Sequence, residues 1–344
     1  MFVLELIVNK MSLFLGIEGL VLSEADKRRL QHPFCSGVIL FSRNYADPAQ
    51  LRSLTQEIKS CSRKLLIAVD HEGGTVQRFR TGFTEIPSAA CLGNLFDHSP
   101  MLALELAEVI GIIIAYELRQ FDIDFSFAPV LDLKDTQSSV IGNRAFHANP
   151  AVVTLLSMAF RKGLRTVGMS AVGKHYPGHG RVVGDSHYSL PKDSRSYEER
   201  APDRFPFLAN IADRIEGIMS AHILLPDSEQ PAGFSAETLV DLRNKGFNGA
   251  IISDDLDMAG AHFFTHPWQR VEAALSAGAD AAMICNTFSD MDEVLMSDLD
   301  FSMSKQSRKR LNALAARKVN EEQALLYYLS ARALFSAYRH QLMA

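Results

Sequence analysis

The chain has 344 residues, of which 47% are hydrophobic and 22% are charged, and its formal net charge is −5 at pH 7. This length and composition are typical of a globular protein that buries a full-sized core. The slightly negative charge offers no basic surface for nucleic acid, so we expect no nucleic-acid partner. No stretch approaches the ~18 consecutive apolar residues of a membrane span, so we expect no membrane partner either.

The first twenty residues are apolar but are interrupted by two glutamates, an asparagine and a lysine. They lack the basic start and the small-residue cleavage site of a signal peptide, so we interpret them as the first strand with its lead-in. Four cysteines are scattered without C-x-x-C spacing, which predicts free thiols and not a disulfide framework. They are Cys35, Cys61, Cys91 and Cys285. Together these features favour a cytoplasmic protein.

Eight short apolar runs alternate with helical stretches along the chain. They are rich in Val, Ile, Leu and Ala and show little alternation with polar residues, which is typical of strands buried on both faces of a parallel sheet. The runs span residues 13–17, 37–41, 64–69, 125–131, 171–174, 217–221, 249–252 and 281–285. Amphipathic stretches at 47–60, 101–121 and 150–166 are long enough for crossover helices. The first of them begins with Asp47-Pro48, an N-cap followed by proline at the first helical position.

This alternation predicts an α/β protein with a (β/α)8 TIM-type barrel, and not an open doubly wound sheet. Residues 306–344 are expected to form a C-terminal helical tail. The sequence has no linker, low-complexity stretch or short-period repeat that would divide it. We therefore expect a single catalytic domain over residues 1–344. The sequence carries no signal for the oligomeric state, and we expect a monomer.

Polar residues follow six of the eight runs at the point where each run ends. The active site of a (β/α)8 barrel opens at the carboxyl ends of its strands, so these side chains should share one pocket. They are Asp70-His71-Glu72, Asp132, Lys174-His175, His222, Asp254-Asp255 and Asn286.

The segment 173–191, GKHYPGHGRVVGDSHYSLP, combines glycines and prolines with three histidines, an aspartate and a lysine. Its glycines permit tight turns, so the segment can fold over a pocket. Asp185 stands two positions before His187, where a carboxylate can orient the imidazole and favour its protonated form for acid–base work. The alternatives are a polar surface loop, or a zinc site at His175, His179 and His187 that lacks H-E-x-x-H or Cys/His pairing.

The segment 247–261, FNGAIISDDLDMAGA, places Asp254 and Asp255 together at the end of a predicted strand. Adjacent strand residues point in opposite directions, so one of the two carboxylates faces the barrel axis. An axial carboxylate can attack an anomeric carbon and form a glycosyl-enzyme intermediate. The residues alone leave open which of the two attacks, and they leave one of Asp254, Asp255 and Asp257 to cap a helix.

Three further residues are candidates for holding sugar hydroxyls. Asp70 and Arg78 flank a Gly-Gly turn, and Arg144 stands in VIGNRAFHANP. Carboxylates and guanidinium groups bind vicinal hydroxyls through paired hydrogen bonds. Surface salt bridges are the alternative for the two arginines, whereas the place of Asp70 at a strand end favours binding.

These motifs resemble glycoside hydrolase family three, specifically its single-domain bacterial β-N-acetylhexosaminidases. The resemblance covers about residues 13–286 in one order, through AVDHEGGTVQRF, FSFAPVLDL, VIGNRAF, GKHYPGHG, DSH, IMSAHILLP, IISDDLDM and AGADAAMICN. It implies a retaining double displacement with Asp254 as nucleophile and His187, oriented by Asp185, as acid and base. The positions that match the family's sugar contacts are Asp70, Arg78, Arg144, Lys174 and His175.

The resemblance also implies a substrate with terminal β-linked N-acetylglucosamine, typically a 1,6-anhydro muropeptide of cell-wall recycling, and no cofactor or metal. His71, Asn143 and Arg181 depart from the family's usual residues and bear on subsite preference, not on catalysis. A phosphorylase that passes the sugar to phosphate is the nearest alternative. A non-catalytic muropeptide sensor would keep the sugar contacts and lose the catalytic residues, and a barrel aldolase would need Lys174 as a Schiff base.

Overall fold

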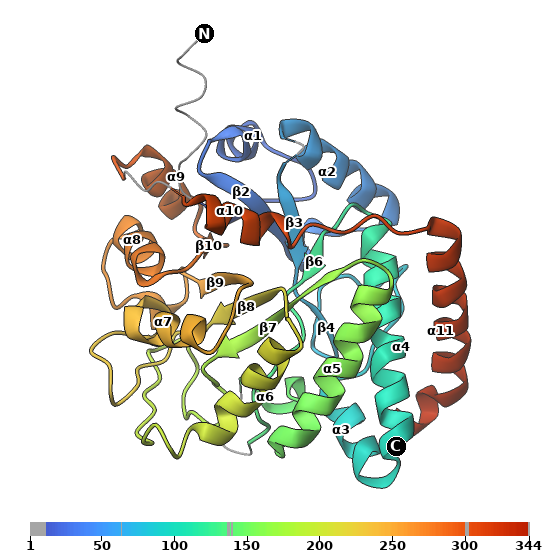
Figure 1. The fold of residues 1–344 in the computed structure, drawn as a ribbon. Coiled ribbons are helices and arrows are strands. Elements are labelled where there is room, and N and C mark those ends of the chain that lie inside the picture. The colour runs from blue at the N-terminus through green and yellow to red at the C-terminus, as the bar shows by residue number, and fades with distance from the viewer. Residues whose placement is uncertain (1–11, 63, 136–137, 139, 300–302, 343–344) are drawn as a thin grey trace.

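The computed structural model describes residues 12–62, 64–135, 138, 140–299 and 303–342 (Figure 1). Eight parallel strands close into a barrel with the order β1-β2-β3-β6-β7-β8-β9-β10, which confirms the predicted (β/α)8 architecture. The barrel strands are β1 (Leu13–Gly16), β2 (Cys35–Leu40), β3 (Leu66–Val69), β6 (Phe125–Ser126), β7 (Ser170–Tyr176), β8 (Gly217–Ser220), β9 (Ala250–Asp255) and β10 (Ala281–Ile284).

Helices surround the barrel and lie between successive strands (Figure 1). Asp47 caps α2 as expected, since its Oδ1 accepts the backbone N–H groups of Ala49 and Gln50 at 2.8 and 2.9 Å. The helices are α1 (Glu24–Gln31), α2 (Pro48–Cys61), α3 (Ala89–His98), α4 (Pro100–Arg119), α5 (Pro150–Thr166), α6 (Ala201–Ala212), α7 (Ala236–Asn244), α8 (Pro267–Ala277), α9 (Phe288–Met296), α10 (Lys305–Asn312) and α11 (Glu321–Leu342).

Two strands, β6 and β7, differ most in length from their apolar runs. β6 ends at Ser126, although the run continues to residue 131, because Pro129 has no N–H to donate to a ladder. The chain beyond it stays beside its neighbour, and Leu131 N–H donates to the carbonyl of Lys174 at 2.7 Å. β7 extends to Tyr176, beyond the end of its apolar run. The run underestimates the strand because Lys174 and His175 are polar, and hydropathy does not identify polar residues as part of a strand.

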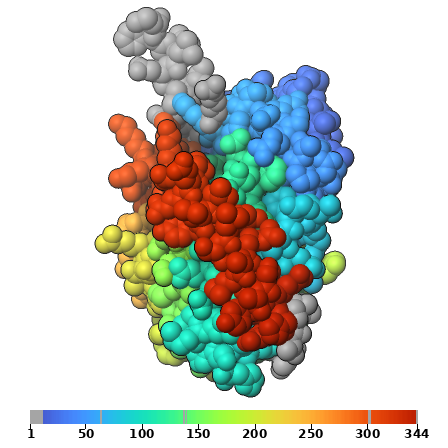
Figure 2. All heavy atoms as spheres, turned by 90° about the vertical axis from the view of Figure 1, so that its right-hand side faces the viewer, coloured from blue at the N-terminus to red at the C-terminus, as the bar shows by residue number. Residues whose placement is uncertain are grey.

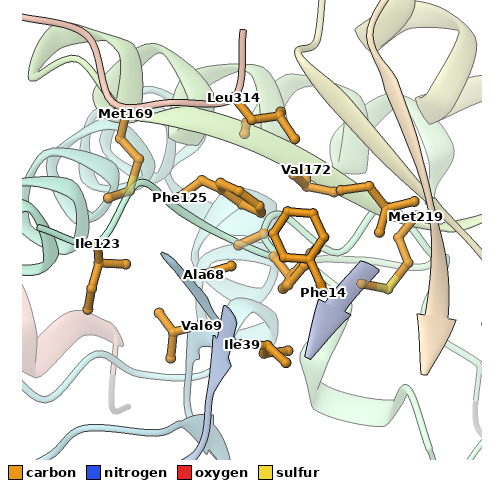
Figure 3. Close-up of a cluster of buried hydrophobic side chains, with 14 of the residues drawn as sticks. Phe14, Ile39, Ala68, Val69, Ile123, Phe125, Met169, Val172, Met219 and Leu314 are labelled. Carbon is orange, nitrogen blue, oxygen red and sulfur yellow. The ribbon is translucent and has the colours of Figure 1, made fainter. Parts of the chain in front are cut away.

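The barrel interior is filled by side chains from the apolar runs. Phe14 and Phe125 meet edge to face with ring centroids 6.0 Å apart, and Val172 and Met219 pack beside them (Figure 3). A Cβ at Gly37 would lie 2.3 Å from the ring of Phe14, so only glycine leaves room for that ring. The interior is thus a packed core, and the polar residues at the ends of the strands lie directly above it.

The predicted C-terminal tail consists of two helices, α10 and α11, separated by residues 313–320. α11 lies along α4, where Tyr328 stacks on Tyr116 with centroids 4.3 Å apart and its hydroxyl donates to Glu117 at 2.9 Å. The expected lead-in, residues 1–11, and residues 343–344 lie outside the described part of the chain. The four cysteines are free, as predicted. Within the described ranges, no helix is both long and apolar enough to cross a membrane.

Candidate active site

A cavity of about 310 Å³ opens at the carboxyl ends of the barrel strands. The strand-end residues Ile39, Met219 and Met283 form part of its lining. Every site residue selected from the sequence except Asp185 also lines it, so the structure brings together Asp70, Arg78, Arg144, Lys174, His175, His187 and Asp254.

Three residues that line the cavity, Asp70, Arg144 and Lys174, form a cluster of alternating charges with Glu72, and we call these four residues the binding wall. Lys174 is 2% exposed, and its Nζ lies 2.7 Å from Asp70 Oδ1 and 2.6 Å from Glu72 Oε1. Burial opposes the ionisation of Asp70, but Lys174 and Arg78 outweigh it and hold the pKa of this carboxyl well below its usual range. The wall is therefore ionised in a site of low dielectric.

Glu72 joins Arg144 to the wall through two hydrogen bonds, from Nε at 3.0 Å and from Nη2 at 2.8 Å. Burial opposes its ionisation too, yet Arg144 and Lys174 lower its pKa. Such a paired contact fixes the plane of the guanidinium. Glu72 was not among the selected site residues, although its place in the polar run after β3 was the signal that could have found it.

Arg78 reaches the wall because the chain reverses after β3. β4 (His71–Gly73) and β5 (Val76–Gln77) form a hairpin, and Gly73 and Gly74 have φ of +102° and +58°, which favours glycine. Arg78 follows directly, with its Nη2 3.4 Å from Asp70 Oδ2. The predicted Gly-Gly turn thus brings the guanidinium of Arg78 back to the carboxylate of Asp70, which lies just before the turn.

His175 is held by a carboxylate that the sequence placed at a strand end but that was not selected as a site residue. Asp132 is fully buried; its Oδ2 lies 2.6 Å from His175 Nδ1, and its Oδ1 accepts the backbone N–H of His179 at 2.6 Å. Burial opposes ionisation of Asp132, but His175 outweighs it and lowers the pKa. A carboxylate at Nδ1 leaves Nε2 of His175 for the cavity.

The Asp185/His187 pair has the geometry that its spacing predicted. Asp185 Oδ1 lies 2.7 Å from His187 Nδ1 and accepts the His187 backbone N–H at 2.8 Å. Burial raises the pKa of Asp185, but these two contacts outweigh it, and the net shift is downward. The His187 side chain is 57% exposed, so the pair lies at the open side of the cavity.

The segment carrying this pair is fastened to the rest of the protein directly before His187. Gly260 N–H donates to the Ser186 carbonyl at 2.8 Å, and His179 Nε2 lies 3.3 Å from Ser186 Oγ. Earlier in the segment, Arg181 pairs with Asp203 of α6 at 2.7 Å. The family departure at Arg181 therefore serves to attach the segment to the barrel, and its side chain does not line the cavity.

Asp254 and Asp255 both line the cavity but differ in their contacts. Asp254 Oδ1 accepts the N–H of Asp255 at 2.8 Å, and none of the ion pairs between described residues includes Asp254. Asp255 accepts hydrogen bonds from Cys285 N–H at 3.1 Å and from Asn286 Nδ2 at 2.9 Å. Burial and the neighbouring Asp257 raise the pKa of Asp255 to about 7.

Asp257 binds the loop that leads from β10 into α9. Its Oδ2 accepts the backbone N–H groups of Cys285, Asn286 and Thr287 at 3.1, 2.7 and 2.8 Å. These donors precede the first residue of α9, whose N-cap is Thr287, so Asp257 fixes a loop and does not take the helix-capping role expected for one of the three aspartates. Asp255 holds the end of β10, and Asp254 keeps an oxygen for the cavity.

The other two family departures lie away from the cavity lining. His71 is buried beside Phe79 and Phe83, with ring centroids 5.9 and 5.7 Å away, and burial lowers its pKa to about 3. It is therefore a neutral part of the packing behind the binding wall. Asn143 is exposed to solvent.

The zinc alternative requires at least three ligand side chains that lie close together. In the described part of the chain, no group of three His, Cys, Asp or Glu side chains could hold a metal ion. Of the three histidines considered for zinc, His175 contacts Asp132 and His187 contacts Asp185. Two of the three imidazoles therefore use Nδ1 to contact a carboxylate.

Comparisons with known proteins agree on one family. Residues 6–317 match the family described as Glycosyl hydrolase family 3 N terminal domain. A Beta-hexosaminidase of Thiobacillus denitrificans is 48% identical over 304 residues, covering 87% of this chain and 84% of that protein. A Beta-hexosaminidase of Nitrosomonas eutropha is 46% identical over 92% of both chains. The crystal structure of NagZ from Neisseria gonorrhoeae in complex with N-trifluoroacetyl-D-glucosamine is similar, with 36% identity and a TM-score of 0.90 over 98% of this chain and 99% of that one.

Proposed function

The chain belongs to glycosyl hydrolase family 3 and is a β-N-acetylhexosaminidase, and we propose that it acts as a retaining exo-β-N-acetylglucosaminidase. One observation carries the proposal. Asp254, a carboxylate that forms no ion pair with another described residue, shares a sugar-sized cavity with the oriented imidazole of His187 and with residues of the binding wall. A nucleophile, a proton donor and hydroxyl-binding groups are the parts that a double displacement at an anomeric carbon requires.

We assign the nucleophile to Asp254 and not to Asp255. The two oxygens of Asp255 are engaged by N–H donors of the β10 end, and its raised pKa favours the protonated, non-nucleophilic form. Asp254 uses one oxygen to accept a backbone N–H, which fixes the carboxylate, and has a second oxygen for attack. The residues alone had left the two aspartates equivalent, so their contacts support the choice that the family resemblance made.

His187 then serves as general acid in the first step and as general base in the second. As acid, its Nε2 protonates the glycosidic oxygen while Asp254 attacks C1, and the bond to the leaving group breaks. As base, neutral Nε2 takes a proton from water, which attacks C1 and releases Asp254. Asp185 fixes the ring through Nδ1 and stabilises the imidazolium that protonation creates.

The binding wall holds the sugar ring against Asp254. The charged groups of the wall hold each other in place. The donors and acceptors that bind the sugar hydroxyls are therefore already oriented before the substrate arrives. Arg78 and His175 extend this set from its two ends. We propose that the wall binds the hydroxyls of a terminal N-acetylglucosamine.

We further propose that the natural substrate is a muropeptide, N-acetylglucosaminyl-1,6-anhydro-N-acetylmuramic acid with its stem peptide, which is degraded during cell-wall recycling. The family resemblance is the support for this choice. A cytoplasmic location is part of the same proposal, and the free cysteines agree with it, because such a compartment keeps thiols reduced.

The test is hydrolysis of a nitrophenyl β-N-acetylglucosaminide, with NMR detection of the anomer that forms first. The wild type should release the β-anomer, and Asp254→Asn should lose at least ~10³-fold of kcat because the covalent step is removed. An inverted first product, or full activity in the variant, would overturn the proposal. Repeating the assay with phosphate distinguishes a phosphorylase, which would yield the sugar phosphate and turn over faster with phosphate present.

A further inference from the structure

The last helix of the structure has two apolar faces, although only one of them is covered. The covered face of α11 packs on the barrel through Ala324, Ala331 and Phe335. On the other side of the helix, Leu326 is 65% exposed, Leu329 is 53% exposed and Leu325 is 42% exposed. Figure 2 shows the C-terminal segment, in red, lying across the outside of the molecule.

These leucines form a continuous stripe and are not scattered. Residues three and four apart are neighbours on a helix surface, and the outward positions of α11 follow that spacing from its first turn to its last. Single exposed apolar residues are normal on a protein surface, whereas a contiguous apolar stripe indicates a contact surface. The stripe consists of Glu322, Leu325, Leu326, Leu329, Ala333, Ser336, Ala337 and His340.

The stripe is complementary to itself when two copies run in opposite directions. If the two-fold axis crosses the helices level with Ala331, every exposed leucine of one copy lies opposite a small residue of the other. Large side chains then fit beside small ones, as close helix packing requires. Leu329 faces Ala333, Leu326 faces Ser336 and Leu325 faces Ala337.

The charges select the same direction. The first turn of α11 is acidic, with Glu321 and Glu322, and the last turn is basic, with Arg339 and His340. Glu321 lies 3.8 Å from Arg119 and Arg339 lies 2.8 Å from Glu85 within the same chain. In the antiparallel arrangement Glu322 of each copy lies opposite His340 of the other, whereas a parallel arrangement would place like charges together.

We propose that α11 is a self-association surface through which two copies of this chain pair with their α11 helices antiparallel. A helix of 22 residues is about 33 Å long, and one such contact buries roughly 1,000 Å² in total, the weak end of specific interfaces. The dimer is therefore transient, with half of the chains paired at a concentration on the order of 10 μM. This departs from the monomer that we expected from the sequence.

The surface lies apart from the active-site cavity, since none of the described cavity-lining residues comes from α3, α4 or α11. Each copy thus keeps an open cavity in the dimer. Association and catalysis can be measured separately, and variants of the stripe are expected to keep the glycosidase activity of each chain.

Sedimentation velocity of the full chain over a concentration series tests the proposal. The wild type should shift from monomer to dimer, and the combined variant Leu326→Glu and Leu329→Glu should weaken the dimer by at least tenfold, because each copy would bury two unpaired carboxylates. Leu155→Glu is the matched control: Leu155 is 46% exposed on α5, and its replacement should leave the dimer unchanged. A chain that stays monomeric far above that concentration overturns the proposal, as does a dimer that survives the stripe variant.

The direction of the helices has its own test. Mixing a Leu329→Cys chain with an Ala333→Cys chain under oxidation should cross-link them, because these positions face each other only in the antiparallel pair. A Glu322→Cys mixture with Leu325→Cys is the control, since those positions lie at opposite ends of the interface. Equal cross-linking in the two mixtures would exclude the antiparallel arrangement, and cross-linking in the first mixture alone would support it.

Discussion

The two sides of the cavity hold their charges in different ways. On the binding wall, Lys174 is 2% exposed and lies between Asp70 and Glu72 at 2.7 and 2.6 Å. On the segment that carries the catalytic pair, His187 is 57% exposed and its Nδ1 lies 2.7 Å from Asp185 Oδ1. The wall is a buried network in which every charge depends on a neighbour, and the segment carries one pair at the solvent boundary.

The difference separates binding from proton transfer. In a buried network, removing one charge leaves its partners uncompensated, so the wall is coupled to folding as well as to substrate binding. A solvent-exposed pair is worth little to folding, and its imidazole can exchange protons with water between the two chemical steps. Variants of the wall should therefore damage stability and activity together, and variants of the pair should damage activity alone.

The largest effect is expected for Lys174→Met, which removes the ammonium group that Asp70 and Glu72 share. Two carboxylates would then be buried without it, so the free energy of unfolding should fall by about 3–5 kcal/mol. Activity should fall by at least ~10²-fold through loss of the fixed geometry. Urea unfolding and nitrophenyl glycoside turnover measure the two losses.

The matched control is Lys162→Met. Lys162 Nζ lies 2.8 Å from Glu108 Oε2, a distance similar to those in the wall, but the lysine side chain is 70% exposed. Its removal should cost less than about 1 kcal/mol. If the two lysine variants lose equal stability, burial does not distinguish the wall from an ordinary surface pair.

His187→Ala is next, with a loss of ~10²–10⁴-fold in kcat on a substrate whose leaving group needs protonation. The loss on a nitrophenolate leaving group should be much smaller, since nitrophenolate departs without a proton. The unfolding free energy should change by less than about 0.5 kcal/mol, because the side chain is exposed. Equal losses on both substrates would contradict the role as an acid.

Asp185→Asn should have a smaller effect, about tenfold in kcat, with the substrate KM nearly unchanged. The amide can still accept a hydrogen bond from His187, but it cannot stabilise the imidazolium by charge. A rise in KM as large as the loss in kcat would indicate a structural role for Asp185.

A final effect, on stability alone, concerns Asp255, whose raised pKa is opposite in sign to the shift at Asp70. Between about pH 4 and pH 7 the folded protein keeps a proton that the unfolded chain has released. The free energy of unfolding should therefore fall as pH rises through this window, by up to about 1.4 kcal/mol per pH unit. Asp255→Asn should remove this dependence, so its stability relative to wild type rises with pH in urea unfolding. A constant difference between the two would show that Asp255 does not keep its proton.

The sequence predicted the barrel and the cavity well because both follow from periodic or positional signals. Apolar runs marked every barrel strand, and polar residues at their ends marked the cavity. Glu72 and Asp132 were visible at strand ends, yet nothing in their spacing showed that they hold Arg144 and His175. Glu72 and Arg144 are 72 positions apart in the sequence, and Asp132 and His175 are 43 positions apart. Only the closed barrel brings the members of each pair together.

The division of labour among Asp254, Asp255 and Asp257 was also beyond the sequence. Three aspartates within four positions look alike until the N–H donors after β10 are placed beside them. Similarly, His71 was a departure from the family pattern without an evident purpose, and its purpose is a ring contact with Phe79 and Phe83.

Because β1 pairs with β10, the barrel can close only after the last of its strands has been synthesised. Leu13 pairs with Ala282, and a Cβ at Gly16 would lie 1.9 Å from the carbonyl oxygen of Cys285, so the seam between the two strands is tight. A chain emerging from the ribosome must hold its first strand unpaired on that side until about residue 285 is free. During this interval the nascent sheet has two open edges, which are sites for aggregation. We therefore expect synthesis, and not the finished enzyme, to be the stage at which chaperones matter most to this protein.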